Sequence, residues 1–284
     1  MKKIFKIIFQ TINTLSLDVV AGSIMTGIFA CKVLDVELDF WWILILALAV
    51  WVMYSADHLL DAWRGKTHAT IKRHRFHYHY RQIILPIWFI AAATCIVLSF
   101  LKLEREILFL GMLIGIGVLI YFGAIHFANK KRPLLLQKEL FIAVIYVAGI
   151  WLAPLVWHGK NPDDMIWMLI ANLVLLAWSE GILTSWFEYD KDSTDQHTSF
   201  SILFGKKASR KFVYFLLLLV FAFSITGILI TGDSMLHQMA FAIELMMGIV
   251  LMLLISFSNV FNKNELYRYV GEASFLLPGL ILFF

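Results

Sequence analysis

The chain has 284 residues, of which 61% are hydrophobic and only 15% are charged, and its formal net charge is +4. A soluble domain of this length carries about a quarter charged residues, so the composition excludes a soluble globular protein and indicates a membrane protein. The basic balance does not indicate nucleic-acid binding, because the charges are divided among the loops between apolar segments.

The apolar segments follow one another along the whole chain. The opening stretch MKKIFKIIFQTINTLSLD is basic and then apolar, without a small-residue cleavage pattern, so no cleavable signal peptide is expected. A membrane helix needs roughly 20 mostly apolar residues, and nine segments qualify. They cover residues 15–33, 40–60, 82–101, 107–127, 138–157, 165–187, 211–231, 237–258 and 268–284. The sequence predicts an all-α integral membrane protein with nine transmembrane helices in a bundle, residues 1–284 forming one polytopic domain.

The distribution of lysine and arginine fixes the expected orientation. With nine spans, nearly all of the 24 basic residues fall on the side of the N-terminus, and acidic residues dominate the opposite loops. The exceptions are Lys32, Lys102, Arg105 and Lys160. By the positive-inside rule, the N-terminus is expected in the cytoplasm and the C-terminus outside. The cytoplasmic loops are expected to cap a central cavity, and the protein is expected in the inner membrane.

The first acidic motif lies where the second predicted helix meets a basic loop. Asp57 and Asp61 are four residues apart, so they project from the same face of a helix. Paired carboxylates with open coordination positions suit Mg²⁺, which takes its remaining ligands from water and from a phosphorylated substrate. Two solvated carboxylates facing the nearby Arg64 would be the simpler interpretation of this motif taken alone.

The second acidic motif follows the sixth predicted helix. Glu188, Asp192 and Asp195 are spaced so that one helical face would carry all three. Glu180 lies two turns earlier, inside the membrane segment, and an acid within a membrane is by default a functional hypothesis. Both motifs fall on the cytoplasmic side, which indicates one site for a divalent metal and a phosphorylated substrate.

These motifs and their surroundings resemble the UbiA superfamily of intramembrane prenyltransferases. That family has nine membrane helices, an NxxxDxxxD motif after the second helix and a DxxxD motif after the sixth. The first motif matches MYSADHLLD, with Asp57 and Asp61 in the two aspartate positions. The stretch HTSFSILFGKKASRK is similar to the family's segment leading into the seventh helix, and KELFIAVIYVAGIWLAPL resembles its fifth helix.

The chain departs from the family pattern at two places. Met53 stands in the asparagine position, and its thioether does not ligate Mg²⁺. In the second motif, an ungapped alignment puts the acidic pair on Glu188 and Asp192. Taking Asp195 as the last acid instead puts Lys191 in the preceding acidic position, where it could contact phosphate. The sequence leaves both alternatives open.

The resemblance implies transfer of an isoprenyl group from a polyprenyl diphosphate to an aromatic or lipidic acceptor within the membrane. Mg²⁺ bound by the acids of both motifs would neutralise the leaving diphosphate. Basic residues would bind the diphosphate, and aromatic faces would stabilise the allylic cation. The predicted catalytic and metal-binding residues are Asp57, Asp61, Glu188, Asp192 and Asp195; the predicted substrate-binding residues are Lys138, Arg64, Lys130, Lys191, Tyr54 and Tyr189.

Other residues of the chain suggest three other functions. A loop with His68, His74, His77 and His79 could bind iron or zinc, but membrane di-iron oxidases use several such boxes and this chain has one. A basic loop that contacts anionic headgroups is the preferred interpretation. A CDP-alcohol phosphotransferase is disfavoured, because the residues after Asp61 lack the Asp-Gly and Ala-Arg pattern of that family. A non-catalytic prenyl-lipid-binding or transport protein of the same fold remains the alternative.

Overall fold

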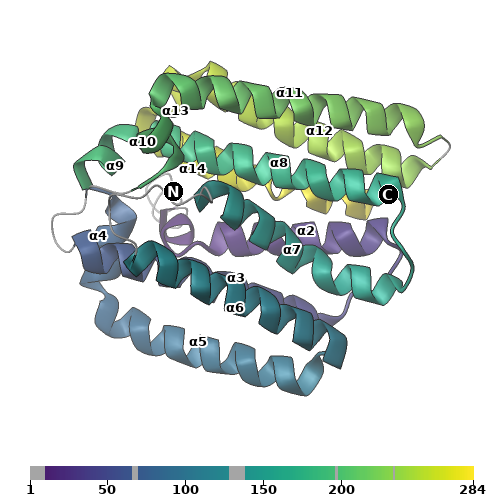
Figure 1. Ribbon diagram of the computed structural model, residues 1–284, viewed down its shortest axis with the longest axis horizontal. Coiled ribbons are helices and arrows are strands. Elements are labelled where there is room, and N and C mark those ends of the chain that lie inside the picture. The colour runs from purple at the N-terminus through teal and green to yellow at the C-terminus, as the bar shows by residue number, and fades with distance from the viewer. Residues whose placement is uncertain (1–9, 66–69, 128–137, 196–197, 233) are drawn as a thin grey trace, which may run out of the picture.

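The computed structural model describes residues 10–65, 70–127, 138–195, 198–232 and 234–284, and all regular structure in these ranges is helical. Long helices run side by side along the longest axis of the molecule (Figure 1). They are α2 (Leu17–Val33), α3 (Phe40–Gly65), α5 (Arg81–Lys102), α6 (Arg105–Phe127), α7 (Lys138–His158), α8 (Asp164–Phe187), α11 (Lys206–Ile230) and α12 (Met235–Ser256).

Short helices gather at one end of this bundle (Figure 1). They are α4 (Lys72–His79), α9 (Tyr189–Asp195), α10 (Phe200–Phe204), α13 (Ser258–Phe261) and η2 (Lys263–Glu265). The chain then re-enters the bundle through α14 (Leu266–Ser274) and ends with the 3-10 helix η3 (Leu277–Phe283). The short helices come from the basic loops of the sequence, so we call this end the cap.

Six helices are long and apolar enough to cross a membrane: α3, α5, α7, α8, α11 and α12. Their ranges include the predicted spans 40–60, 82–101, 138–157 and 165–187 and most of 211–231 and 237–258. The predicted spans 15–33 and 107–127 correspond to the helices α2 and α6. That these two helices and the ninth segment cross the membrane stays a prediction. Residues 268–284 form no single helix, because α14 ends at Ser274 and the chain continues as η3 with Pro278 in its first turn.

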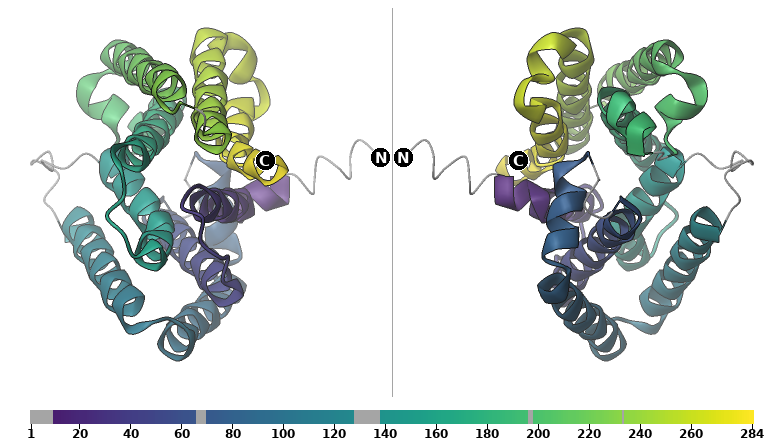
Figure 2. Two further views of the ribbon diagram at one scale, coloured as in Figure 1. Left: turned by 90° about the vertical axis from the view of Figure 1, so that its right-hand side faces the viewer. Right: turned by 90° about the vertical axis from the view of Figure 1, so that its left-hand side faces the viewer.

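The arrangement of the helices is visible along the bundle (Figure 2). α5 and α6 lie at one end of the cross-section, and α11 and α12 lie at the other. The outward faces of α5 and α6 carry exposed apolar side chains such as Phe89, Ile90 and Leu119, as expected for helices in contact with lipid.

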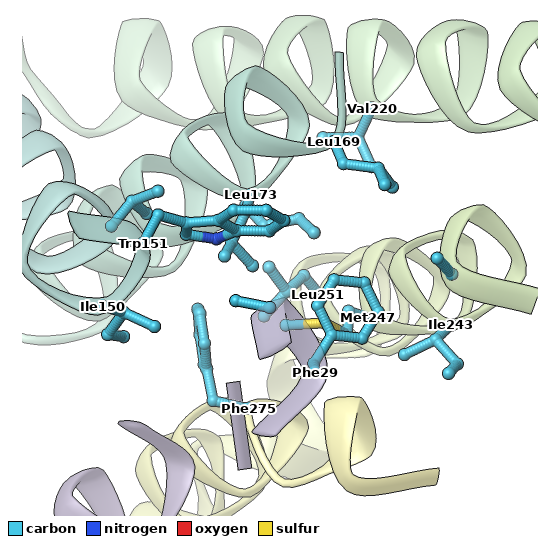
Figure 3. Packing of buried hydrophobic residues seen from close by; sticks show 14 of the residues in the cluster. Phe29, Ile150, Trp151, Leu169, Leu173, Val220, Ile243, Met247, Leu251 and Phe275 are labelled. Atoms are coloured by element: carbon cyan, nitrogen blue, oxygen red, sulfur yellow. The ribbon is translucent and has the colours of Figure 1, made fainter. Parts of the chain in front are cut away.

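The best-packed part of the core lies where α2, α7, α8 and α12 meet (Figure 3). Phe29 of α2 packs edge-on against Trp151 of α7, and Leu173 and Met247 are buried close by. Between α11 and α12 a small residue allows close approach, since a Cβ at Gly227 would lie 2.5 Å from the ring of Phe241.

Local signals in the sequence set the helix ends that matter for the cap. Asp163 caps α8 by accepting a hydrogen bond from the backbone N–H of Ile166 at 2.9 Å. At its other end α8 stops at Phe187, and α9 starts at Tyr189. Gly205, with a φ of 83°, separates α10 from α11 in a conformation that favours glycine. These breaks leave α9 and α10 at the same end of the bundle as α4 (Figure 1).

Candidate active site

A cavity of about 280 Å³ lies between the cap and the bundle. Its walls come from α3, α4, α7, α8, α9 and α14, so segments far apart in the sequence meet there. The ionisable side chains that line it are Asp57, His58, Asp61, Arg73, His74, Lys138, Glu139, Glu180, Glu188, Asp192, Arg268 and Glu272.

Both acids of the first motif line this cavity. Asp57 and Asp61 project from the same face of α3, which continues unbroken to Gly65. Lys138 Nζ, at the start of α7, lies 3.5 Å from Asp57 Oδ1. His74 Nε2, from α4, lies 3.7 Å from Asp61 Oδ2. Two carboxylates therefore face a cavity that also offers a lysine ammonium group.

Glu188, the first acid of the second motif, also lines the cavity but is already engaged. Its Oε1 accepts a hydrogen bond from Tyr267 Oη at 2.9 Å and is in a close ion pair with the guanidinium of Arg268. Burial alone would raise the pKa of Glu188, but the charges of Arg268 and Lys191 and the Tyr267 hydrogen bond lower it below its usual value. This carboxylate holds α14 against α8 and is poorly placed to give its lone pairs to a metal.

Asp192 is the acid of the second motif that faces the first. It is buried on α9 and lines the cavity. Burial, followed by the nearby charge of Glu188, raises the pKa of Asp192 to about 7; Asp61 raises it too, and Lys138 opposes the shift. Asp61 and Asp192 line the same cavity, so an acid of the first motif lies near an acid of the second.

The remaining acid, Asp195, does not line the cavity. Its Oδ2 accepts hydrogen bonds at 2.9 Å from both the backbone N–H and the hydroxyl of Thr70. Of the three acids expected to share one helical face, Glu188 and Asp192 line the cavity and Asp195 does not. Asp195 instead joins α9 to the segment before α4.

The predicted substrate-binding residues are divided in the same way. Tyr54 and Lys138 line the cavity. Lys191 lies outside the lining and pairs with Glu265 at 2.8 Å. Tyr189 also lies outside it, with Lys206 Nζ 5.6 Å from its ring centroid. Lys130 and the side chain of Arg64 lie outside the part of the chain that the structure describes.

Two cations that line the cavity, Arg73 and Arg268, were not among the predicted site residues. Arg73 Nη2 lies 3.0 Å from Glu272 Oε1, and its Nη1 lies 3.0 Å from His58 Nε2. Arg268 pairs with Glu188. Arg73 Nε has no hydrogen-bond partner among the described residues, so it keeps a buried donor for a further polar group. In the sequence, the only signal for Arg73 and Arg268 was the basic character of the loops that contain them.

The donor set fits Mg²⁺ shared with a substrate. Asp57, Asp61 and Asp192 offer the hard carboxylate oxygens that Mg²⁺ prefers. The pKa of Asp192 is raised first by burial and then by the charge of Glu188, and a bound cation would favour its ionised form. Within the described ranges no three His, Cys, Asp or Glu side chains are already arranged as a metal site. Substrate phosphates would therefore supply the remaining ligands, as is usual for Mg²⁺.

His68 lies outside the described residues, and the described histidines at the cap end do not form such a site either. The rings of His58 and His77 have centroids 5.1 Å apart, and those of His58 and His74 are 6.1 Å apart. Arg73 bonds His58 Nε2, and the backbone carbonyl of Arg73 meets His77 Nδ1 at 2.9 Å. A positive guanidinium beside these rings disfavours an iron or zinc ion there.

The fold and the cavity together define a class of protein: a helical membrane protein with an acid-lined chamber under its cap. Two solved structures share this fold. A UbiA homolog from Aeropyrum pernix K1 matches with a TM-score of 0.66 and 13% identity, over 95% of this chain and 98% of that one. A digeranylgeranylglyceryl phosphate synthase matches with a TM-score of 0.57 and 16% identity, over 99% and 98%.

The likeness to these structures confirms the resemblance indicated by the motifs: the chain has the fold of the UbiA superfamily of membrane prenyltransferases. No protein-family model matches the sequence. No curated protein matches it either.

Proposed function

We propose that this chain is a Mg²⁺-dependent intramembrane prenyltransferase, which transfers an isoprenyl group from a polyprenyl diphosphate to an aromatic or lipidic acceptor. The observation that carries the proposal is the single cavity in which Asp57, Asp61 and Asp192 meet. One of the two structural neighbours is by its name a digeranylgeranylglyceryl phosphate synthase, which agrees with this chemistry.

A second, apolar cavity supports a substrate with a long hydrocarbon tail. Its volume is about 390 Å³, and its walls come from α3, α5, α6 and α7. Tyr54, Ile142 and Tyr146 line both cavities, so the apolar space begins where the acidic one ends. From Tyr54 to Trp42 its wall follows α3 for about 18 Å at 1.5 Å per residue. An isoprenoid tail fits this space, with its diphosphate among the acids.

The side chains at the junction have defined tasks in this proposal. Mg²⁺ bound with the diphosphate would neutralise its charge and so favour its departure. Lys138 donates a charge-assisted hydrogen bond to the diphosphate, and Arg73 offers the free Nε–H. Tyr54 and Tyr146 line both cavities, so their aromatic rings lie near the place where the allylic carbon would become positive.

The membrane placement belongs to the same proposal. We place α2, α6 and the C-terminal segment in the membrane beside the six long apolar helices, so that the chain forms one domain of nine spans. The cap, which is rich in lysine and arginine, then faces the cytoplasm, where the diphosphate substrate is soluble. An inner-membrane location follows from this orientation.

The decisive experiment uses the full-length chain in phospholipid nanodiscs with geranylgeranyl diphosphate. Diphosphate release that needs Mg²⁺, and that stops on addition of EDTA and resumes with excess Mg²⁺, is the expected result. A prenyl-lipid-binding or transport protein would bind the same probe without releasing diphosphate. Binding with no release at any Mg²⁺ concentration would therefore refute the transferase and favour that alternative.

A further inference from the structure

Glu180 is a cavity acid that the diphosphate chemistry does not use. It belongs to a face of α8 that lines the cavity at three- and four-residue spacing: Ala177, Glu180, Gly181, Thr184, Ser185 and Glu188. Eight residues separate Glu180 from Glu188, which at 1.5 Å per residue puts it about 12 Å deeper along the helix. It therefore lies below the acids that would bind the diphosphate.

The carboxylate of Glu180 is held in place through one oxygen. Thr184 Oγ1 donates a hydrogen bond to Glu180 Oε1 at 2.9 Å. Gly271 of α14 lies against the same oxygen, since a Cβ at Gly271 would be 3.2 Å from it. Among the described residues none donates a hydrogen bond to Oε2, and the side chain is partly exposed to the cavity that it lines. One carboxylate oxygen is therefore left to meet a substrate.

Three other glutamates of the cavity wall are occupied by protein partners. Glu139 Oε1 accepts a hydrogen bond from the backbone N–H of Phe200 at 2.7 Å. Glu272 is bonded by Arg73 and by Asn13. Glu188 is paired with Arg268. Glu180 differs from these three acids because its one protein hydrogen bond comes from a neutral hydroxyl on its own helix.

The charges around Glu180 select against an anionic partner. Arg73 and Arg268 are the nearest cations described, and each is paired with a glutamate of its own, Glu272 and Glu188. An acceptor that brought a carboxylate or phosphate to Glu180 would add an unpaired negative charge in an apolar surrounding, which is costly. A neutral hydroxyl group can instead donate to the open Oε2.

We propose that Glu180 is the general base that takes the proton from the hydroxyl group of an uncharged acceptor. The inference rests on the proposed prenyl transfer. The bond between the prenyl C1 and the diphosphate oxygen breaks, and its electron pair leaves with the diphosphate. A lone pair of the acceptor hydroxyl forms the new C–O bond to C1, and the hydroxyl proton passes to a Glu180 carboxylate oxygen. The products are an ether and diphosphate, and Glu180 is within reach of the acceptor rather than the leaving group.

The test separates donor activation from acceptor deprotonation. Full-length protein in nanodiscs receives geranylgeranyl diphosphate and Mg²⁺ with dodecanol, with dodecylphenol or with no added acceptor. For Glu180→Gln we expect ether formation to fall about 100-fold, the lower range for loss of a general base. Diphosphate release without added acceptor, which reports activation of the donor, should fall by a much smaller factor than ether formation. Glu180→Asp, which keeps the carboxylate, should recover part of the ether formation.

Glu244→Gln is the matched control. Glu244 is a fully buried acid of the bundle, accepts a hydrogen bond from Asn172 at 2.8 Å and does not line the cavity. Its replacement should leave both products unchanged. Ether from dodecanol alone identifies an aliphatic alcohol acceptor, and ether from dodecylphenol alone a phenol; either result supports the inference.

Three outcomes would overturn the inference. Equal ether formation by wild type and Glu180→Gln excludes Glu180 as the base. Equal loss of diphosphate release and ether in Glu180→Gln means that Glu180 acts on the donor. Wild-type protein that releases diphosphate but forms no ether with either probe contradicts the hydroxyl acceptor. In contrast, wild-type protein that releases no diphosphate refutes the proposed function itself, and so the two failures are distinguishable.

Discussion

The two acidic motifs look alike in the sequence and differ in the fold. In the first, α3 runs unbroken past Asp57 and Asp61, so both carboxylates reach the cavity. In the second, α8 ends at Phe187, and each acid takes a different partner. Glu188 holds α14 through Arg268, Asp195 holds Thr70, and Asp192 remains for the cavity.

This difference shows that acidic residues at helical spacing can have two roles: some line the cavity, and others hold helices together. The ion pair between Glu188 and Arg268 joins α8 to α14, and the hydrogen bonds between Asp195 and Thr70 join α9 to the segment before α4. These contacts keep the cap over the cavity. The acids of the first motif also pair with other helices, Asp57 with Lys138 and Asp61 with His74, but both of them line the cavity. Substitutions in the first motif should therefore change activity, whereas substitutions in the second should change activity, stability or cap closure, according to the residue.

The largest effect is expected in the first motif. Asp57→Asn and Asp61→Asn each remove a negative oxygen from the proposed Mg²⁺ site without changing side-chain size, so diphosphate release should fall by about 10³-fold. Release of diphosphate from geranylgeranyl diphosphate in nanodiscs measures this. Asp164→Asn, exposed at the far end of α8, is the matched control and should retain full activity. Full activity in purified Asp61→Asn would contradict a metal role for this motif.

Glu188→Gln tests the structural half of the comparison. It leaves the guanidinium of Arg268, whose side chain is only 12% exposed, without its counter-ion, and breaking such a pair costs about 3–5 kcal/mol. Thermal unfolding of the protein in detergent should occur at a clearly lower temperature. The double variant Glu188→Gln with Arg268→Met removes the stranded charge and should regain most of the loss. If Glu188→Gln unfolds like the wild type but has lost Mg²⁺ dependence, Glu188 is a ligand after all.

Asp192 should give the site its dependence on pH. Its pKa of about 7 means that the carboxyl is protonated below this value and ionised above it. Because Mg²⁺ binds the ionised form, Mg²⁺ affinity should fall as the pH decreases from about 8 to about 6, by up to tenfold per unit below the pKa. Mg²⁺ activation curves at several pH values measure this. Asp192→Asn should bind Mg²⁺ more weakly, and its affinity should no longer follow this pH profile.

The smallest effect is expected for Asp195. Asp195→Ala removes the hydrogen bonds to Thr70, which are worth about 1 kcal/mol, and touches no cavity wall. The rate of diphosphate release at saturating substrate should stay within about threefold of the wild-type rate. Thr70→Val, which removes the partner hydroxyl, should behave in the same way. A loss as large as that of Asp61→Asn would return Asp195 to the metal site.

The sequence was sufficient for properties that depend on near neighbours. Composition and apolar segments of membrane length predicted an all-helical membrane protein, and six of the expected spans are helices of the required length. The four-residue spacing of Asp57 and Asp61 predicted a shared face, because helix geometry alone fixes it. The motifs also indicated the superfamily whose fold the chain has.

Only the tertiary structure decided which acids face the cavity. Glu188 and Arg268 are 80 residues apart in the sequence, so no local pattern predicts that they pair. The same holds for Arg73 with Glu272, and for Asp195 with Thr70. Hydrophobicity and helical periodicity are properties of a segment, whereas the partner of a buried charge is chosen by whichever segments pack around it.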